Sequence, residues 1–280
     1  MNTKSIKLIS TISFVGLLSA CAGGGGGGGS SSSSSGSGGS GSYWVTSDVK
    51  AAWAEGYTGK GVVVNNIDYT PHTNPDGSSH ASSTSQIISA IAPDATVANT
   101  SITGWTNAMM DAIAGSNARV INLSIGTGGT TSSSPSFYSG TTNAVITKAA
   151  GNSGNGVTAD QELSNKMLWN SNMQNNTIYV GAIDAKTGNI ASYSTAAGAY
   201  ASRFVVADGQ GPTYQGTSYS APVVAGYAAL ITQKFPNSTG AQIAQAILDT
   251  AIMKPGWDPA VYGRGQANLA GALSPQGKLK

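Results

Sequence analysis

The sequence predicts an α/β protein with a mainly parallel β-sheet and helices on both faces. The main observation is that short apolar runs rich in β-branched residues alternate with segments of helical periodicity along the chain. Such alternation is typical of a parallel sheet whose crossover helices cover it on both sides. In folds of this kind, functional groups gather at the carboxyl ends of the strands.

The elements follow in order after residue 43. The strand-like runs are residues 61–67, 96–101, 118–125, 144–149, 177–182 and 204–207, and the helix-like segments are residues 49–54, 82–91, 106–116, 223–235 and 239–250. We find no internal repeat and no second domain boundary, so residues 43–280 are expected to form one folded domain.

Composition limits the classes of partner. The 280 residues carry a formal net charge of +2, only 9% of them are charged, and no basic block is present. Nucleic acid is therefore not an expected partner, because binding its phosphates requires clustered Lys and Arg.

The N-terminal residues resemble an export signal. Lys4 and Lys7 precede an apolar stretch, residues 8–18, which is shorter than the roughly twenty residues needed to span a bilayer. We interpret residues 1–20 as a signal peptide. Cys21 is the only cysteine, so no intramolecular disulfide can form.

The sequence Leu-Ser-Ala-Cys that ends at Cys21 resembles the lipobox of bacterial lipoproteins. The resemblance implies that Cys21 is lipidated and tethers the protein to a bacterial membrane. Lipoproteins retained at the inner membrane tend to have aspartate after the lipidated cysteine. Because this chain has Ala22 there, we expect delivery to the outer membrane. Whether the domain faces the periplasm or the cell surface stays open. The alternative is an ordinary signal peptide with a chance cysteine. Residues 21–42 are nearly all Gly and Ser and predict a flexible tether spanning about 25 Å.

The most informative motif is Gly-Thr-Ser-Tyr-Ser-Ala-Pro, residues 216–222. Ser218 lies between a glycine turn and an apolar run that predicts a buried helix. Unpaired N–H groups at a helix N-terminus can stabilise an oxyanion beside the serine oxygen. The motif resembles the nucleophile motif of the subtilisin-like serine proteases (subtilases, peptidase S8 type), which implies that Ser218 is an acyl-transfer nucleophile. The alternative is a serine that only caps the helix.

Two further segments resemble this family. Ala-Ala-Gly-Asn-Ser-Gly, residues 149–154, implies that the Asn152 amide donates to the oxyanion. Residues 118–126 resemble the family strand that pairs with the substrate backbone, which implies main-chain recognition by Ser124, Ile125 and Gly126. The alternative is a core strand without a free edge.

The acid and the base stand in weaker motifs. Asp68 ends a predicted strand, but Asp68-Tyr69-Thr70 lacks the family's glycine. His80 has Ala81 where the family has glycine, although residues 87–95 match the family's helix and the turn after it. That register selects His80 and leaves His72, in a proline-containing loop, as a surface histidine. The order aspartate, histidine, serine is that of subtilisins.

The resemblance implies a serine endopeptidase that acts through an acyl-enzyme on protein or peptide substrates, without a cofactor. No cluster of carboxylates is spaced for calcium, so no obligatory metal is expected. We expect a monomer. The alternative is a pseudoprotease, a surface binding module whose altered Asp68 and His80 motifs no longer support catalysis. Lipobox, tether and protease domain together also resemble the passenger domains of lipidated autotransporters.

Overall fold

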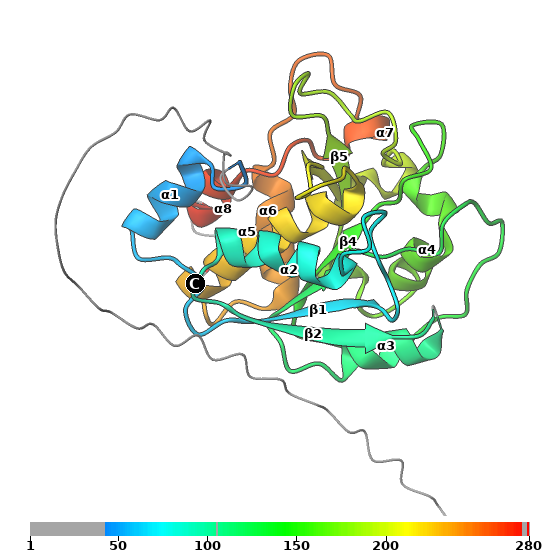
Figure 1. Ribbon diagram of the computed structural model, residues 1–280, viewed down its shortest axis with the longest axis horizontal. Helices are drawn as coiled ribbons and strands as arrows, with labels where there is room; N and C mark the ends of the chain where they lie inside the picture. Colours follow the sequence, from blue (N-terminus) through cyan, green and yellow to red (C-terminus); the bar gives the residue numbers. More distant parts are fainter. Residues whose placement is uncertain (1–42, 105, 276–278, 280) are drawn as a thin grey trace, which may run out of the picture. The chain divides into compact units, whose positions relative to one another are not determined.

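A computed structural model describes residues 43–104, 106–275 and 279. Its centre is a six-stranded sheet in the order β2-β1-β3-β4-β5-β6, in which every neighbouring pair is parallel (Figure 1). The strands are β1 (Val63–Tyr69), β2 (Thr96–Ile102), β3 (Val120–Leu123), β4 (Val145–Ala149), β5 (Thr177–Ile183) and β6 (Phe204–Asp208). The predicted fold class, a mainly parallel sheet in an α/β protein, is confirmed.

Helices cover both faces of this sheet. The α-helices are α1 (Ser47–Ala54), α2 (His80–Ile91), α3 (Asn107–Ala114), α4 (Leu163–Trp169), α5 (Thr217–Lys234), α6 (Gly240–Thr250), α7 (Pro259–Tyr262) and α8 (Leu269–Leu273), with short 3-10 turns at Ala159–Gln161, Gln174–Asn176 and Gly198–Arg203. One apolar core joins the sheet to α1, α2, α5, α6 and α8, and the other joins it to α3 and α4. Figure 1 shows α2, α5 and α6 on one side of the sheet and α3 on the other.

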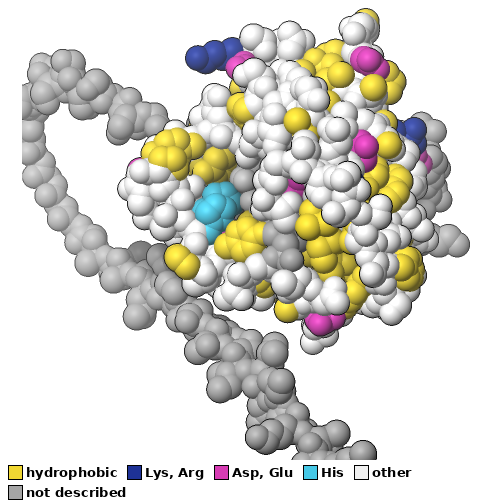
Figure 2. Space-filling model, turned by 90° about the vertical axis from the view of Figure 1, so that its right-hand side faces the viewer, with side chains coloured by type: hydrophobic (Ala, Val, Ile, Leu, Met, Phe, Trp, Pro, Cys, Tyr) yellow, Lys and Arg dark blue, Asp and Glu magenta, His cyan; other side chains and the backbone are white. Residues whose placement is uncertain are grey.

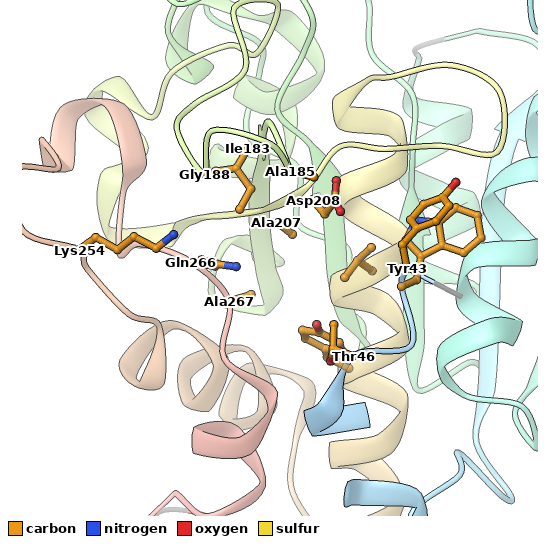
Figure 3. Close-up of a pocket in the computed structure, with 13 residues that line it drawn as sticks. Tyr43, Thr46, Ile183, Ala185, Gly188, Ala207, Asp208, Lys254, Gln266 and Ala267 are labelled. Atoms are coloured by element: carbon orange, nitrogen blue, oxygen red, sulfur yellow. The ribbon is translucent and has the colours of Figure 1, made fainter. Parts of the chain in front are cut away.

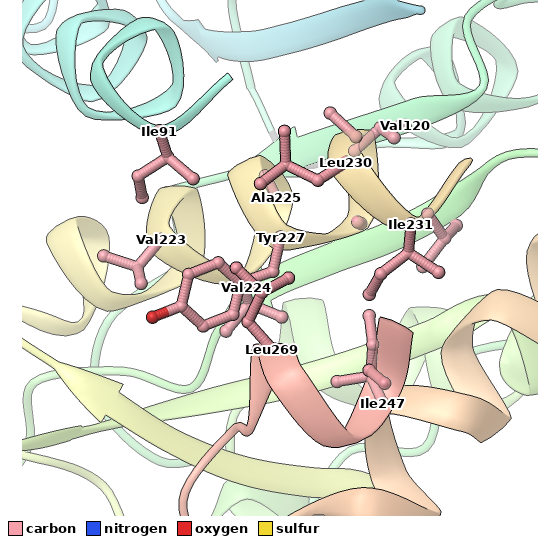
Figure 4. Packing of buried hydrophobic residues seen from close by; sticks show 14 of the residues in the cluster. Ile91, Val120, Val223, Val224, Ala225, Tyr227, Leu230, Ile231, Ile247 and Leu269 are labelled. Carbon is pink, nitrogen blue, oxygen red and sulfur yellow. The ribbon is translucent and has the colours of Figure 1, made fainter. Parts of the chain in front are cut away.

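Helix α5 is the central element of the first core. Its residues Val224, Leu230 and Ile231 are fully buried and pack among side chains of α2, α6 and the sheet (Figure 4). At Gly226, helix α5 approaches α2 closely, since a Cβ on this glycine would lie 2.7 Å from the Cβ of Ile91. This contact fixes α5 against α2, and these are the helices that begin with the Ser218 and His80 motifs.

The structure differs from the sequence prediction at the start of α5. The helix begins at Thr217, whereas the sequence predicted residue 223. The apolar run that marks this helix in the sequence begins after Pro222, and proline is unfavourable inside a helix. Pro222 instead lies inside the helix, beyond the first turn, where it cannot donate to the carbonyl of Ser218. Ser218 therefore belongs to the first turn of α5.

The predicted signal peptide, Cys21 and the tether lie outside the described residues. Within the described part of the chain, no helix is both long enough and apolar enough to cross a membrane.

Candidate active site

Asp68 and His80 are brought together by β1 and α2. Asp68 is near the carboxyl end of β1, and His80 is the first residue of α2, whose N-cap is Ser79. The Nδ1 atom of His80 lies 2.6 Å from Oδ2 of Asp68, and the two residues are only 5% and 2% exposed. Because the carboxylate only accepts, the imidazole holds its proton on Nδ1 and leaves Nε2 as a base.

His72 also contacts this carboxylate, a contact that its interpretation as a surface histidine did not include. Its Nδ1 atom lies 2.7 Å from Oδ1 of Asp68, and its ring stacks on that of His80 with centroids 3.9 Å apart. Its side chain is 34% exposed. The loop between β1 and α2 folds back here, since the His80 N–H donates to the His72 carbonyl at 3.1 Å. Sequence spacing alone does not reveal this reversal.

Asp68 is held as a carboxylate despite its burial. Burial alone would raise its pKa, but hydrogen bonds from His72 and His80 outweigh this and hold the pKa below its usual value. The N–H of Tyr69 adds a third bond to Oδ1, at 2.7 Å. The acid is therefore charged at neutral pH and can stabilise an imidazolium at His80.

Ser218 is half-buried in the first turn of α5, and the residue after it lies against His80. The ring of the next residue, Tyr219, lies 5.9 Å from that of His80, and its hydroxyl donates to Asn74 at 2.9 Å. In this conformation the Ser218 hydroxyl donates to the backbone oxygen of Ser124 at 2.9 Å, and not to His80. Catalytic hydrogen bonds are often unformed until substrate binds.

Asn152 follows β4 and is oriented by the start of α5. Its Oδ1 accepts from the Thr217 N–H at 2.9 Å and from the Thr217 hydroxyl at 3.0 Å. Both acceptor positions of the amide oxygen are thereby occupied, so Nδ2 points away as a donor. Gly151 precedes it with φ +121°, which lets the chain turn out of β4.

The segment after β3 carries the predicted substrate-binding residues. The pairing of β3 with its neighbours ends at Leu123, so residues 124–126 continue beyond the ladder. Ser124 and Ile125 are buried, and Gly126 is half-buried. The strand itself is internal to the sheet, paired with β1 on one edge and with β4 on the other.

A buried ion pair that the sequence did not predict lies behind this segment. A Cβ on Gly126 would lie 3.0 Å from Oε1 of Glu162, whose carboxylate accepts from both the N–H and the hydroxyl of Thr127. Nζ of Lys148 is fully buried, 3.9 Å from Oε2 of Glu162. Burial lowers the pKa of Lys148 to about 8, although Glu162 opposes the shift. In the sequence, the lysine inside the apolar run of β4 is the feature that could have indicated a buried ion pair.

Of the described residues, one cluster of His, Cys, Asp and Glu side chains could hold a metal ion, namely Asp68, His72 and His80. Cys21 cannot be placed, because it lies outside the described residues. A separate cavity of about 260 Å³ lies beside α5, between Tyr43, Asp208 and Lys254 (Figure 3). None of Asp68, His80, Asn152 and Ser218 lines it.

Comparisons with known proteins identify the family of this chain. Residues 64–277 match the model of the subtilase family, peptidase S8. Mycosin-4 of Mycobacterium tuberculosis is 52% identical over 60 residues, a segment that spans 21% of this chain and 13% of mycosin-4.

Solved structures show the same fold. The prenylagaramide maturation protease PagA aligns with a TM-score of 0.60 at 19% identity, over 82% of this chain and 98% of its own. MycP1 without its N-terminal propeptide aligns with a TM-score of 0.59 at 24% identity, over 82% and 96%. The family match covers most of the chain and includes every candidate residue of the site. The chain thus belongs to the subtilase family and has the subtilisin-like fold.

Proposed function

We propose that this protein is a serine endopeptidase that hydrolyses peptide bonds through an acyl-enzyme, with Ser218 as the nucleophile. The observation that carries the proposal is the 2.6 Å hydrogen bond between His80 and a charged, buried Asp68. Ser218 stands in the first turn of α5, and the ring of the next residue, Tyr219, lies 5.9 Å from that of His80. This arrangement supplies a base with a fixed tautomer and a serine hydroxyl at a helix N-terminus.

Proton transfer begins at Ser218. When substrate binds, the hydroxyl leaves the carbonyl of Ser124 and turns its proton toward Nε2 of His80. The oxygen attacks the peptide carbonyl, and His80 takes the proton and later gives it to the leaving amine. Asp68 keeps the ring oriented and stabilises the imidazolium. Water then repeats the sequence on the acyl-enzyme and releases Ser218.

Negative charge develops on the former carbonyl oxygen. Nδ2 of Asn152 and the backbone N–H of Ser218 are the proposed donors to that oxygen. Thr217 holds the side-chain amide of Asn152 in place before the reaction, so the dipole of that amide needs no reorganisation in the transition state. The positive end of α5 contributes to the same stabilisation.

Recognition of substrate is proposed to use the backbone of residues 124–126. An extended peptide laid beside this continuation of β3 would pair with it as an added strand. Glu162 supports the turn after it through two hydrogen bonds to Thr127. Main-chain pairing of this kind suits protein and peptide substrates of varied sequence.

A catalytically silent binding module is the weaker candidate. Its motivation was the missing glycines near Asp68 and His80. The Asp68–His80 bond is made without those glycines, and Asn152 is oriented as a donor. Both observations favour catalysis.

The test of this proposal is hydrolysis of unfolded casein by the purified wild type and by Ser218→Ala. We expect the wild type to release peptides and the variant to release none above background, with thermal unfolding unchanged. The exposed serine variant Ser133→Ala is the matched control and should retain the wild-type rate. Equal casein cleavage by Ser218→Ala and wild type would refute the assignment.

We also propose that Cys21 carries a lipid and anchors the protease domain to a bacterial membrane, with outer-membrane delivery. The lipobox-like sequence and the Gly/Ser-rich residues 22–42 support this proposal. The same order of segments underlies the resemblance to lipidated autotransporter passengers.

Metabolic labelling with an alkyne fatty acid tests the anchor. Wild type and the tether control Ser35→Ala should incorporate label and sediment with membranes, whereas Cys21→Ser should do neither. Label in Cys21→Ser, or none in the wild type, would reject lipidation at this residue. Cleavage of the domain by protease added to intact cells distinguishes a surface position from a periplasmic one.

A further inference from the structure

The acid of the site is hydrogen-bonded to one histidine more than acid–base catalysis requires. Both oxygens of Asp68 face an Nδ1 atom, that of His72 at 2.7 Å and that of His80 at 2.6 Å. The two rings are stacked, with an angle of 27° between their planes. The mechanism uses His80 and Asp68 and leaves His72 without a role.

We propose that Asp68, His72 and His80 form an inhibitory binding site for a divalent transition-metal ion, with Zn²⁺ as the fitting example. One ligand atom from each residue lies within 4.8 Å of the other two. Tetrahedral Zn²⁺ with bonds of about 2.0–2.1 Å holds its ligand atoms about 3.4 Å apart. Small movements of the side chains are therefore enough to place all three on one ion, with water in the fourth position.

The chemistry of the ligands selects the class of ion. Two imidazole nitrogens and one carboxylate oxygen suit Zn²⁺, Ni²⁺ and Cu²⁺. Ca²⁺ and Mg²⁺ prefer six or more oxygen ligands and do not fit such a set.

One of the three ligands is accessible to solvent, and the loop that carries it is held by a hydrogen bond. His72 is the ligand that solvent reaches, with a side-chain exposure of 34% against 6% for His80 and 3% for Asp68. Figure 2 shows histidine at the surface of this face, between apolar side chains. The loop that carries His72 is closed by the bond from the His80 N–H to the His72 carbonyl. The two rings are thus held side by side before an ion binds.

Inhibition follows from the tautomer. Coordination at Nδ1 replaces the N–H···O bond to Asp68 with a nitrogen–metal bond, and the proton of each neutral imidazole moves to Nε2. His80 then carries its proton on the nitrogen that should accept from Ser218. The metal-bound ring has no lone pair left for the hydroxyl proton, so acylation stops. Removing the ion restores the original tautomer.

The binding test is independent of proteolysis. Full-length Ser218→Ala keeps all three ligands, and we expect it to bind one Zn²⁺ by titration calorimetry and to give the visible absorption of tetrahedral Co²⁺. His72→Asn, made in the same background, keeps a donor to Asp68 but removes a ligand, and should bind at least about tenfold more weakly. Asp76→Asn, an exposed acid on the same loop, should bind like the parent.

The activity test uses the enzyme with Ser218 in place. Zn²⁺ should inhibit casein hydrolysis reversibly, EDTA should restore the rate, and Ca²⁺ at equal concentration should leave the rate unchanged. The fraction of activity that Zn²⁺ removes should be much smaller in His72→Asn than in the wild type, whatever the rate of the variant without the ion. Absence of one-to-one binding, or equal binding by the Ser218→Ala protein with and without His72→Asn, would overturn the proposal. A protein that binds the ion but cleaves nothing would refute the proposed function and leave this site standing.

Discussion

Thr217 holds the amide oxygen of Asn152 through two bonds, from its backbone N–H at 2.9 Å and from its hydroxyl at 3.0 Å. The same hydroxyl accepts from the N–H of Gly151 at 3.2 Å. Thr217 therefore joins the turn after β4 to the first turn of α5. Through this connection the proposed oxyanion donor is bonded directly to the residue before the proposed nucleophile.

Asn152→Ala should lower kcat by about 10²–10³-fold with little change in KM, because the donor acts on charge that appears only in the transition state. The magnitude is that measured when a subtilisin loses this donor. Steady-state kinetics on a chromogenic peptide would measure it. The exposed control Asn172→Ala should match the wild type, and a loss confined to KM would contradict the oxyanion role.

Thr217→Val removes the hydroxyl and keeps the shape and the backbone N–H. It should lower kcat by roughly fivefold, the equivalent of one hydrogen bond. The same peptide assay tests this. A loss as large as that of Asn152→Ala would mean that Thr217 does more than orient the amide.

Asp68→Asn should lower kcat by about 10⁴-fold, since the amide cannot stabilise an imidazolium and presents a donor to one of the two histidines. Kinetics with the same peptide would measure the loss, and circular dichroism would establish that the fold is retained. Asp76→Asn, on the exposed loop, should keep the wild-type kcat. Activity of Asp68→Asn within tenfold of the wild type would remove Asp68 from the mechanism.

Glu162→Gln should lower the free energy of unfolding by about 2–4 kcal/mol at pH 7, because it breaks a buried, multiply hydrogen-bonded ion pair. Burial would raise the pKa of Glu162, but Lys148 and the hydrogen bonds from Ser164 and Thr127 hold it below its usual value. A lowered folded pKa gives stability that is present above the unfolded pKa and is lost as the pH falls through the folded one.

Urea denaturation at pH 7, 5 and 4 would measure this dependence. The difference between the wild type and Glu162→Gln should shrink toward acid pH. Glu55→Gln, at an exposed pair with Lys234, should change stability by less than about 1 kcal/mol. A difference for Glu162→Gln that grows on acidification would contradict the assignment of a buried carboxylate.

Lys148 should make the stability of the protein depend on pH in the alkaline range. Its folded pKa of about 8 lies below the usual 10.5, because burial disfavours its charge. Between these values the unfolded chain binds more protons, so this group makes stability rise with pH. The wild type should therefore gain stability relative to Lys148→Met from pH 8 to 10, as measured by urea denaturation at each pH. A flat difference would mean that Lys148 titrates normally.

Most of the fold could be predicted from the sequence. The strand-like runs ending near Ile67, Ala149 and Ala207 correspond to β1, β4 and β6, because buried parallel strands are continuous apolar runs. Helix α4 was not predicted. Its seven residues, Leu163–Trp169, include buried Ser164 and Asn165, and so short a helix carries no apolar stripe.

The parts of the candidate site that could be predicted are those that stand at a fixed spacing from a recognisable helix or strand. His80 was chosen over His72 by the register of the helix after it, and the structure places His80 on Asp68. The contact between His72 and Asp68 was missed, because it depends on a loop that reverses within a few residues. The pair of Lys148 and Glu162 was missed for a related reason, since fourteen positions of chain separate two side chains that only the tertiary fold brings together.

Labelling with a serine-directed fluorophosphonate tests the central claim, an activated Ser218, most directly. The wild type should react to one adduct per chain, and mass spectrometry should locate the adduct on the peptide that contains Ser218. His80→Gln should react at least about 10³-fold more slowly, and Ser218→Ala should not react at all. An unlabelled but folded wild type, or an adduct that persists in Ser218→Ala, would contradict the account.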